Sequence, residues 1–358
     1  EFYDESLITV SSDSYWAIPS VNSELNRIVI TFSTNHLIAS YTATVSVNDG
    51  EKVIDLFIHV VVPPLDIYRL IDDPTRPITY GIQRNGIYNG SIIAFDPFRE
   101  TITSCITTGA GPTDFVINDD STELFVINSV EKSIDIIDLV TFSLKETINL
   151  PYYSTWGSAS DTTANIDLGP ADIIYYSDGA WGPVLRVLKR STNVVLQSII
   201  FDGSSPTNNT GFMDFAVTKD KTKMIAMPQY GWSAGTHSPK IGQFTINGDG
   251  TVTPFKVANL SSFSREPFEA PVLLSNDDKI VVMKTISTDP SNIGNLGRVF
   301  PSAIWSMLPN GKVVATGDKL YEYDTGIELY TIPGGSTTGS GYTYTKAQAF
   351  TSDYSRFI

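Results

Sequence analysis

Cysteine and histidine are nearly absent from this sequence, which holds one cysteine and three histidines among 358 residues. A single cysteine, Cys105, cannot form an intramolecular disulfide bond, and its place in the alternating run 101–107 predicts a small buried hydrophobic residue. His36 and His59 both precede residue 64, so no histidine cluster can form in the rest of the chain. We therefore expect no metal site and no cofactor, and the motifs below contain no set of catalytic residues.

Positive charge is also scarce. The chain has 24 Lys and Arg against 39 Asp and Glu, a formal net charge of −15 and a pI near 4.5. Nucleic acids and anionic membranes bind clustered cations, so we expect neither as a partner. No stretch approaches the roughly 18 consecutive apolar residues of a membrane span, which argues against membrane insertion. Because the chain begins at Glu1, without Met or a signal peptide, we expect a processed chain or part of a longer polypeptide.

The chain instead contains many short β-patterned runs separated by polar turns. Between residues 111 and 150 four such runs alternate with turns rich in Asp, Asn, Ser and Lys. Four antiparallel strands of this length form one small twisted sheet with two apolar faces, and such a sheet cannot bury both faces alone. Copies of the sheet must therefore stack beside it. The four runs are 115–117, 124–127, 134–137 and 144–150.

The same strand-turn-strand pattern recurs along the chain. Asp114 and Asp214 both stand just before the first strand of a unit, in the segments GPTDF and GFMDF. The repeat length falls near the roughly 40 to 45 residues of a four-stranded propeller blade, so radial stacking is the economical arrangement. The aligned units are 115–128, 216–229, 272–285, 305–318 and 349–358.

The segment 111–150 resembles the YVTN-type β-propeller repeat. That family combines a Pro-x-Asp start, a turn rich in Asp and Gly, a Tyr-Val-Thr-Asn-like second strand and a third strand containing Ile-Asp. The matching positions here are Pro112, Asp114, Asp119-Asp120, 125–128 and 134–138. The resemblance implies a propeller scaffold, and such scaffolds carry unrelated functions.

Residues 1–63 follow a different pattern, which predicts a small β-sandwich with Asn48-Asp49-Gly50 as a hairpin turn. With Trp16 and a final strand at 54–62, this segment resembles the BACON-type immunoglobulin-like module, although Ser40 and Ala43 replace glycines of that family. Pro63-Pro64 forms a stiff joint. We predict an all-β chain with an Ig-like sandwich at 1–63 and a propeller at 64–358.

The propeller is predicted to have seven blades, the last incomplete in this chain. In the third blade, the runs 172–176, 184–188 and 194–201 are its second to fourth strands. In the fifth, the outer strands are not identified within 286–301. The predicted blades span 66–109, 111–150, 152–203, 211–258, 270–301, 302–333 and, after two strands only, 347–358.

Connections in a propeller sort onto two faces. The turns between strands one and two and between strands three and four are short here, and paired acids such as Asp119-Asp120 and Asp277-Asp278 are expected to cap them. The opposite, long-loop face receives the connections 84–90, 152–168, 202–211, 229–239, 259–269, 286–301 and 334–346. Long loops on a rigid scaffold commonly bind ligands.

Aromatic side chains on the long-loop face are the candidate ligand-binding residues. They could stack on sugar rings or anchor a protein partner, or they could pack the loops onto the blades. The candidates are Tyr88, Trp156, Trp181, Tyr230, Trp232 and His237.

Three functional hypotheses follow. The leading one is a secreted, extracellular or cell-surface protein, non-catalytic, whose long-loop face binds a glycan or a protein. The second rests on the hairpin 244–254, which resembles those of lactonase-type propellers and implies a hydrolase with carboxylates and Arg84 or Arg298 in the channel. The third is a structural subunit of a larger surface assembly.

Overall fold

The structure is a computed structural model of the chain. Within the residues that it describes, the fold is all-β, as the sequence predicts, and its one helical element is a 3₁₀ turn at Arg190–Thr192. The described residues are 8–13, 17–22, 27–32, 41–48, 52–60, 67–85, 89–99, 101–151, 164–177, 184–199, 212–228, 240–259, 271–283, 286–301, 304–308, 310–316 and 319–331.

In the described part of the chain, six four-stranded antiparallel sheets follow one another, and each pairs its strands in sequence order. We number them sheet one to sheet six. The strands of the first three sheets are β6 (Ile67–Asp72), β7 (Thr79–Asn85), β8 (Asn89–Asp96) and β9 (Thr101–Thr107); β10 (Pro112–Ile117), β11 (Glu123–Asn128), β12 (Ser133–Asp138) and β13 (Ser143–Asn149); and β14 (Ile166–Leu168), β15 (Ile173–Ser177), β16 (Leu185–Lys189) and β17 (Val194–Ile199).

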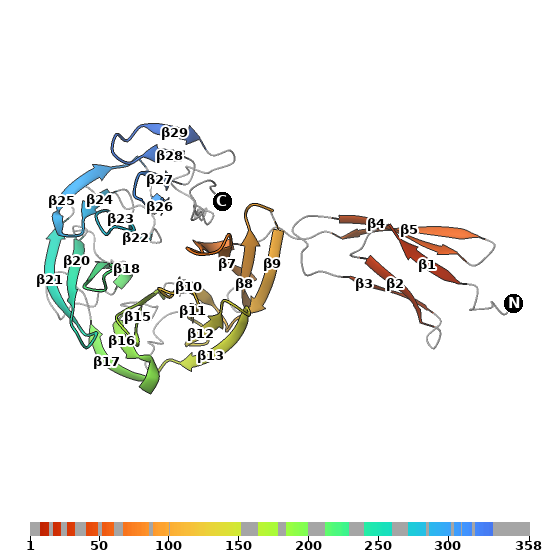
Figure 1. Ribbon diagram of the computed structural model, residues 1–358, viewed down its shortest axis with the longest axis horizontal. Helices are drawn as coiled ribbons and strands as arrows, with labels where there is room; N and C mark the ends of the chain where they lie inside the picture. The colour runs from red at the N-terminus through yellow and green to blue at the C-terminus, as the bar shows by residue number, and fades with distance from the viewer. Residues whose placement is uncertain are drawn as a thin grey trace, which may run out of the picture.

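The other three sheets repeat this arrangement. Their strands are β18 (Phe212–Val217), β19 (Lys223–Pro228), β20 (Lys240–Ile246) and β21 (Val252–Asn259); β22 (Val272–Leu274), β23 (Val281–Met283), β24 (Ile286–Asp289) and β25 (Asn292–Val299); and β26 (Ile304–Met307), β27 (Val313–Thr316), β28 (Lys319–Glu322) and β29 (Glu328–Thr331). Figure 1 shows the six sheets around a common axis, with β10, β18 and β22 toward the centre and β13, β17, β21 and β25 at the rim.

Neighbouring sheets bury each other's faces. Five clusters of buried hydrophobic side chains each combine residues of two consecutive sheets, from sheets one and two to sheets five and six. Strand β11 shows the consequence, because all six of its residues are buried. Leu124 and Val126 pack toward sheet one, whereas Phe125 and Ile127 pack toward sheet three. The period-two alternation of a strand thus supplies two cores instead of one.

In sheets two, four, five and six, the turns between the first and second strands have a common backbone geometry. Ser121, Lys221, Asp278 and Gly311 occupy equivalent positions with φ between 53° and 73°. Each donates its backbone N–H to the carbonyl three residues earlier, at 2.7–2.9 Å. An acid stabilises several of these turns: Asp120 accepts from both the backbone N–H and the hydroxyl of Thr122. This capping role is the one predicted for the acidic pairs.

The strand predictions hold in sheet three and need correction in sheet five. Strands β15, β16 and β17 match the three predicted runs, and the unpredicted first strand is β14. The stretch 286–301 is not a long loop, because it contains β24 and β25, the two outer strands of sheet five. Residues 347–358, the predicted start of a seventh blade, lie outside the described residues.

Cys105 is exposed, which corrects the prediction of a buried hydrophobic residue. It lies on β9, the outermost strand of sheet one, where Ile102 faces the sheet interior and the alternate positions face solvent. Cys105 shares its face with Thr101 and Thr103, so the sequence alternation itself placed it outside.

Two smaller sheets precede the propeller sheets. One contains β1 (Thr9–Ser12), β4 (Tyr41–Asn48) and β5 (Val53–Val60), and the other contains β2 (Ala17–Asn22) and β3 (Arg27–Phe32). Ala17 and Ala43 form their shared core. The predicted boundary at Pro63-Pro64 lies outside the described residues. In Figure 1 these sheets extend to one side of the propeller ring.

The mutual burial of sheets predicts which side chains stabilise the ring. Ile136 is fully buried between sheets two and three, whereas Leu144, on the outer strand of the same sheet, is 50% exposed. We expect Ile136→Ala to lower the free energy of unfolding by about 2–5 kcal/mol, because it leaves a cavity between sheets. The control Leu144→Ala should change it by no more than about 0.5 kcal/mol. Denaturant titration followed by circular dichroism measures both, and equal losses would contradict the two-core arrangement.

Candidate functional site

Three carboxylates line the inside of the ring on consecutive first strands. Asp114 lies on β10, Asp167 on β14 and Asp214 on β18. One oxygen of each accepts the backbone N–H of the following residue, at 2.7–2.8 Å. The other oxygen accepts a backbone N–H from the next sheet: Ile166 for Asp114 (3.0 Å), Val217 for Asp167 (2.7 Å) and Val272 for Asp214 (2.7 Å). Each carboxylate therefore joins two sheets near the axis.

One arginine faces these three acids. The Arg69 guanidinium, from sheet one, lies 2.9 Å from the Asp114 carboxylate. Burial raises the pKa of Asp214 to about 7, and Arg69 only partly opposes this shift. Burial likewise raises the pKa of Asp167 to about 6, against the opposing charge of Lys221. The pKa of Asp114 is also raised by burial, although Arg69 and two backbone N–H groups favour its charged form.

The protein itself thus already supplies hydrogen-bond donors to these three acids, which we call the axial acids. Both oxygens of Asp114, Asp167 and Asp214 accept backbone hydrogen bonds, which identifies inter-sheet bridging as their structural role. The arginines named for a lactonase-like channel make other contacts. Arg84 donates to the Pro112 carbonyl at 2.7 Å, and Arg298, on the outer strand β25, donates to the carbonyls of Asp324 and Thr325.

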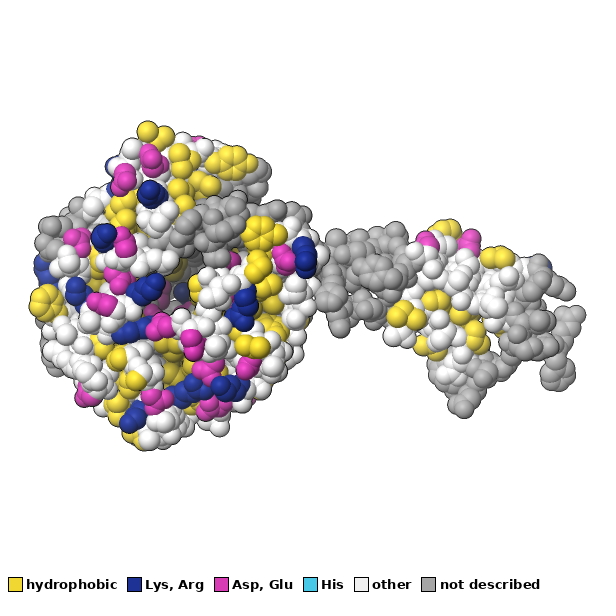
Figure 2. All heavy atoms as spheres, viewed as in Figure 1, with side chains coloured by type: hydrophobic (Ala, Val, Ile, Leu, Met, Phe, Trp, Pro, Cys, Tyr) yellow, Lys and Arg dark blue, Asp and Glu magenta, His cyan; other side chains and the backbone are white. Residues whose placement is uncertain are grey.

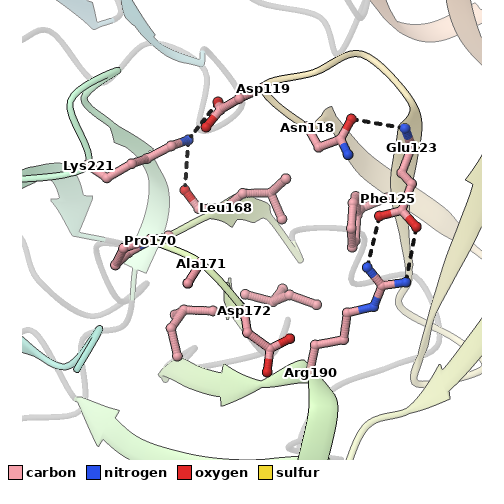
Figure 3. A pocket seen from close by; sticks show the side chains of 13 residues that line it. Asn118, Asp119, Glu123, Phe125, Leu168, Pro170, Ala171, Asp172, Arg190 and Lys221 are labelled. Atoms are coloured by element: carbon pink, nitrogen blue, oxygen red, sulfur yellow. Dashed lines mark hydrogen bonds and ion pairs between the residues drawn. The ribbon is translucent and has the colours of Figure 1, made fainter. Parts of the chain in front are cut away.

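A cavity of about 290 Å³ opens where sheets two, three and four meet. Its lining comes from turns between first and second strands, from the third-to-fourth turn of sheet three, and from the adjoining ends of β11, β14 and β15. The cavity therefore lies on the face of the ring that carries these short turns, which we call the short-turn face. This face is opposite the long-loop face, which is predicted to bind the ligand. The lining residues are Asn118, Asp119, Glu123, Phe125, Leu168, Gly169, Pro170, Ala171, Asp172, Ile173, Ile174, Arg190 and Lys221 (Figure 3).

Two ion pairs across sheets border this cavity. Arg190 of sheet three donates to both Glu123 oxygens, at 2.8 and 3.2 Å, and to Glu146 at 2.9 Å. Lys221 of sheet four donates to the Leu168 carbonyl at 3.2 Å and lies 3.3 Å from Asp119. The Arg190 and Lys145 hydrogen bonds lower the pKa of Glu123, so this carboxylate is ionised at neutral pH.

The predicted aromatic residues of the long-loop face lie outside the described residues, so their roles stay predictions. These are Tyr88, Trp156, Trp181, Tyr230, Trp232 and His237.

The cavity residues were not predicted from the sequence. Glu123, Arg190 and Lys221 belong to three different sheets, and only the ring brings them together. One usable signal was present: Lys221 occupies the turn position that holds Ser121 and Gly311 in other sheets, where a lysine is the exception.

Within the described part of the chain, no group of three or more His, Cys, Asp or Glu side chains is placed to hold a metal ion. The same ranges contain no helix with the length and apolar character needed to cross a membrane.

Solved structures similar to this chain include β-propellers. Hydrazine synthase from Kuenenia stuttgartiensis aligns with a TM-score of 0.59 at 14% identity, covering 82% of this chain and 92% of that one. The β-propeller domain of Myceliophteria thermophila Cps50 (Swd1) aligns with a TM-score of 0.54 at 9% identity, covering 77% and 89%. A functionally unknown protein from Desulfotomaculum acetoxidans DSM 771 aligns with a TM-score of 0.54 at 11% identity, covering 83% and 94%.

At these identities the likeness establishes the fold alone: the chain has a β-propeller-like fold. No protein-family model matches the chain, and no curated protein matches it. The finer resemblances, to the YVTN repeat and to the BACON module, stay predictions.

The raised pKa values of the axial acids predict how stability depends on pH. The folded protein holds protons on Asp167 and Asp214 up to pH values near 6 and 7, whereas the unfolded chain releases them near pH 4. This stabilisation is complete below pH 4 and is lost as pH rises through 6 and 7. Acids with lowered pKa values, such as Glu123, make the free energy of unfolding rise with pH instead, but only at pH values below this interval.

We therefore expect the free energy of unfolding to fall between pH 5 and pH 8, and Asp214→Asn to reduce that slope. Asp324→Asn makes the same substitution at an exposed acid on sheet six; it is the control and should leave the slope unchanged. Urea titrations at a series of pH values measure it. A stability that rises over this interval in the parent protein would contradict the assignment.

Proposed function

We propose that this protein is a non-catalytic binding or scaffold protein that presents its partner-binding loops on a rigid ring. The observation that supports this is the set of five inter-sheet cores, which hold successive sheets together through both of their faces. Loops anchored on such a ring have fixed starting points, which reduces the ordering cost of binding.

The proposed partner is a glycan or a protein that contacts the long-loop face. The support is the concentration of aromatic residues in the connections between second and third strands and between sheets. Trp156 and Trp232 are the strongest candidates among them, because indole rings bury large areas at low conformational cost.

The proposed location is the extracellular space or a cell surface, where the chain would be part of a larger polypeptide or assembly. The resemblance of residues 1–63 to a BACON-type module supports this proposal. The acidic composition agrees with a well-solvated outer surface, and Figure 2 shows cationic and anionic side chains interspersed over the propeller face in view.

Substitution of the two tryptophans tests the proposal. Glycan arrays and pulldowns with the full chain should identify a ligand, and Trp156→Ala combined with Trp232→Ala should weaken its binding at least ten-fold, because both aromatic contacts are lost. Tyr330→Ala removes an aromatic ring that is 54% exposed on the rim strand β29, and it should leave binding unchanged.

Two results would count against this function. One is a ligand whose binding is insensitive to both tryptophan substitutions, and the other is the absence of any ligand from both screens.

A further inference from the structure

We propose that the cavity where sheets two, three and four meet is a second binding site, which takes a peptide segment of a partner protein with an apolar side chain beside a positively charged one. This site lies on the short-turn face and is independent of the long-loop face. Three features carry the proposal: a preformed apolar floor, cations that already have partners, and two further acids in the lining, Asp119 and Asp172.

The floor of the cavity is apolar and held in place by the ring. Phe125 and Ile174 belong to the core between sheets two and three, and Ile173 belongs to the core between sheets three and four. Leu168 and Pro170 complete the lining at this level. Because these side chains are fixed on both sides, the cavity exists before any ligand arrives, which lowers the cost of binding. Its volume of about 290 Å³ suits a single side chain rather than a larger molecule.

The two cations at the cavity are half-buried and paired. The Arg190 side chain is 23% exposed, and its guanidinium is shared between Glu123 and Glu146. It also lies over the Phe125 ring, with 5.3 Å between Cζ and the ring centroid. The Lys221 side chain is 18% exposed and is held by the Leu168 carbonyl. An anionic ligand would therefore have to displace existing partners of both cations.

Asp119 and Asp172 are held less tightly than the Glu123 carboxylate. Asp119 is 76% exposed, and its pair with Lys221 is of the surface type that contributes little energy. Asp172 accepts the Ser191 backbone N–H through Oδ2 at 3.0 Å. Figure 3 shows Asp119 and Asp172 on opposite sides of the cavity, with Lys221 and the Glu123–Arg190 pair between them. The lining carries three acids and two bases, a formal charge of −1.

This charge arrangement selects the ligand. A positive group at the mouth gains from Asp172 and shares Asp119 with Lys221, it leaves the Arg190 pair intact, and an adjoining apolar group covers the floor. A basic residue next to an aromatic or aliphatic residue in a partner's peptide supplies both groups. An acidic residue in the same position would meet Asp119 and Asp172 with like charge.

Three capped peptides test the site on the full chain. Acetyl-Ala-Phe-Lys-Ala-amide should bind at least ten-fold more tightly than acetyl-Ala-Phe-Glu-Ala-amide, which reverses the charge, and acetyl-Ala-Ala-Lys-Ala-amide, which lacks the apolar side chain. Ligand-observed NMR titration measures the three dissociation constants. Equal binding of all three peptides, tighter binding of the acidic peptide, or no saturable binding up to 10 mM would overturn the proposal.

Isosteric variants locate the binding. Asp119→Asn and Asp172→Asn should each weaken the Phe-Lys peptide several-fold, because each removes a charge but keeps an oxygen acceptor for existing hydrogen bonds. Asp324→Asn removes the same charge far along the chain, on sheet six, and should leave binding unchanged. If all three variants weaken binding equally, the peptide is attracted by the overall charge of −15 and the cavity is not its site. These outcomes do not depend on Trp156 or Trp232, so this proposal and the long-loop function can fail separately.

Discussion

Every interior sheet of this ring has two apolar faces, and covering both of them is the constraint on which the rest of the structure depends. In β11 the alternation of side chains sends Leu124 and Val126 one way and Phe125 and Ile127 the other. A sheet of this kind is unstable alone and stable between two siblings. Repetition of the unit therefore leads to radial packing, with polar groups confined to the turns, the rim and the axis.

Polar contacts between sheets reinforce this packing both near the axis of the ring and farther from it. Near the axis, Asp114, Asp167 and Asp214 bridge successive first strands. Farther out, the Tyr175 hydroxyl donates to the Gly250 carbonyl at 2.7 Å, and Gln197 exchanges two hydrogen bonds with the Val252 backbone. Because buried hydrogen bonds are lost when sheets separate, these contacts fix the angular spacing that apolar packing alone leaves adjustable. A fixed spacing is what gives a constant shape to the cavity where sheets two, three and four meet.

The sequence predicted the repeated sheet well wherever a unit had four clear apolar runs, as in sheet two. It missed β14 because three residues, Ile166, Asp167 and Leu168, are too short to show a period. It missed β25 because Gly294 and Gly297 interrupt a polar strand that packing with its neighbours nonetheless completes. The local sequence pattern shows where apolar and polar side chains alternate. Packing against neighbouring strands decides whether a short or glycine-containing segment also forms a strand.

The candidate functional site could be predicted only in part, because it also depends on contacts between sheets. Asp114 and Asp214 were noticed as recurring residues, but their bridging role depends on the next sheet's backbone, which no local pattern reveals. The short-turn cavity joins Glu123, Arg190 and Lys221 across sheets, so only the arrangement of neighbouring sheets could identify it.

The mutual dependence of neighbouring sheets can be measured most directly by native-state hydrogen exchange in a Leu188→Ala variant. Leu188 is fully buried on sheet three, in the core that it shares with Phe125 and Ile127 of sheet two. If the sheets stabilise each other, amide protection in β11 should fall by the same factor as in β16, because both sheets open together. Loss of protection in β16 with unchanged protection in β11 would show that each sheet is stable by itself and would contradict this account.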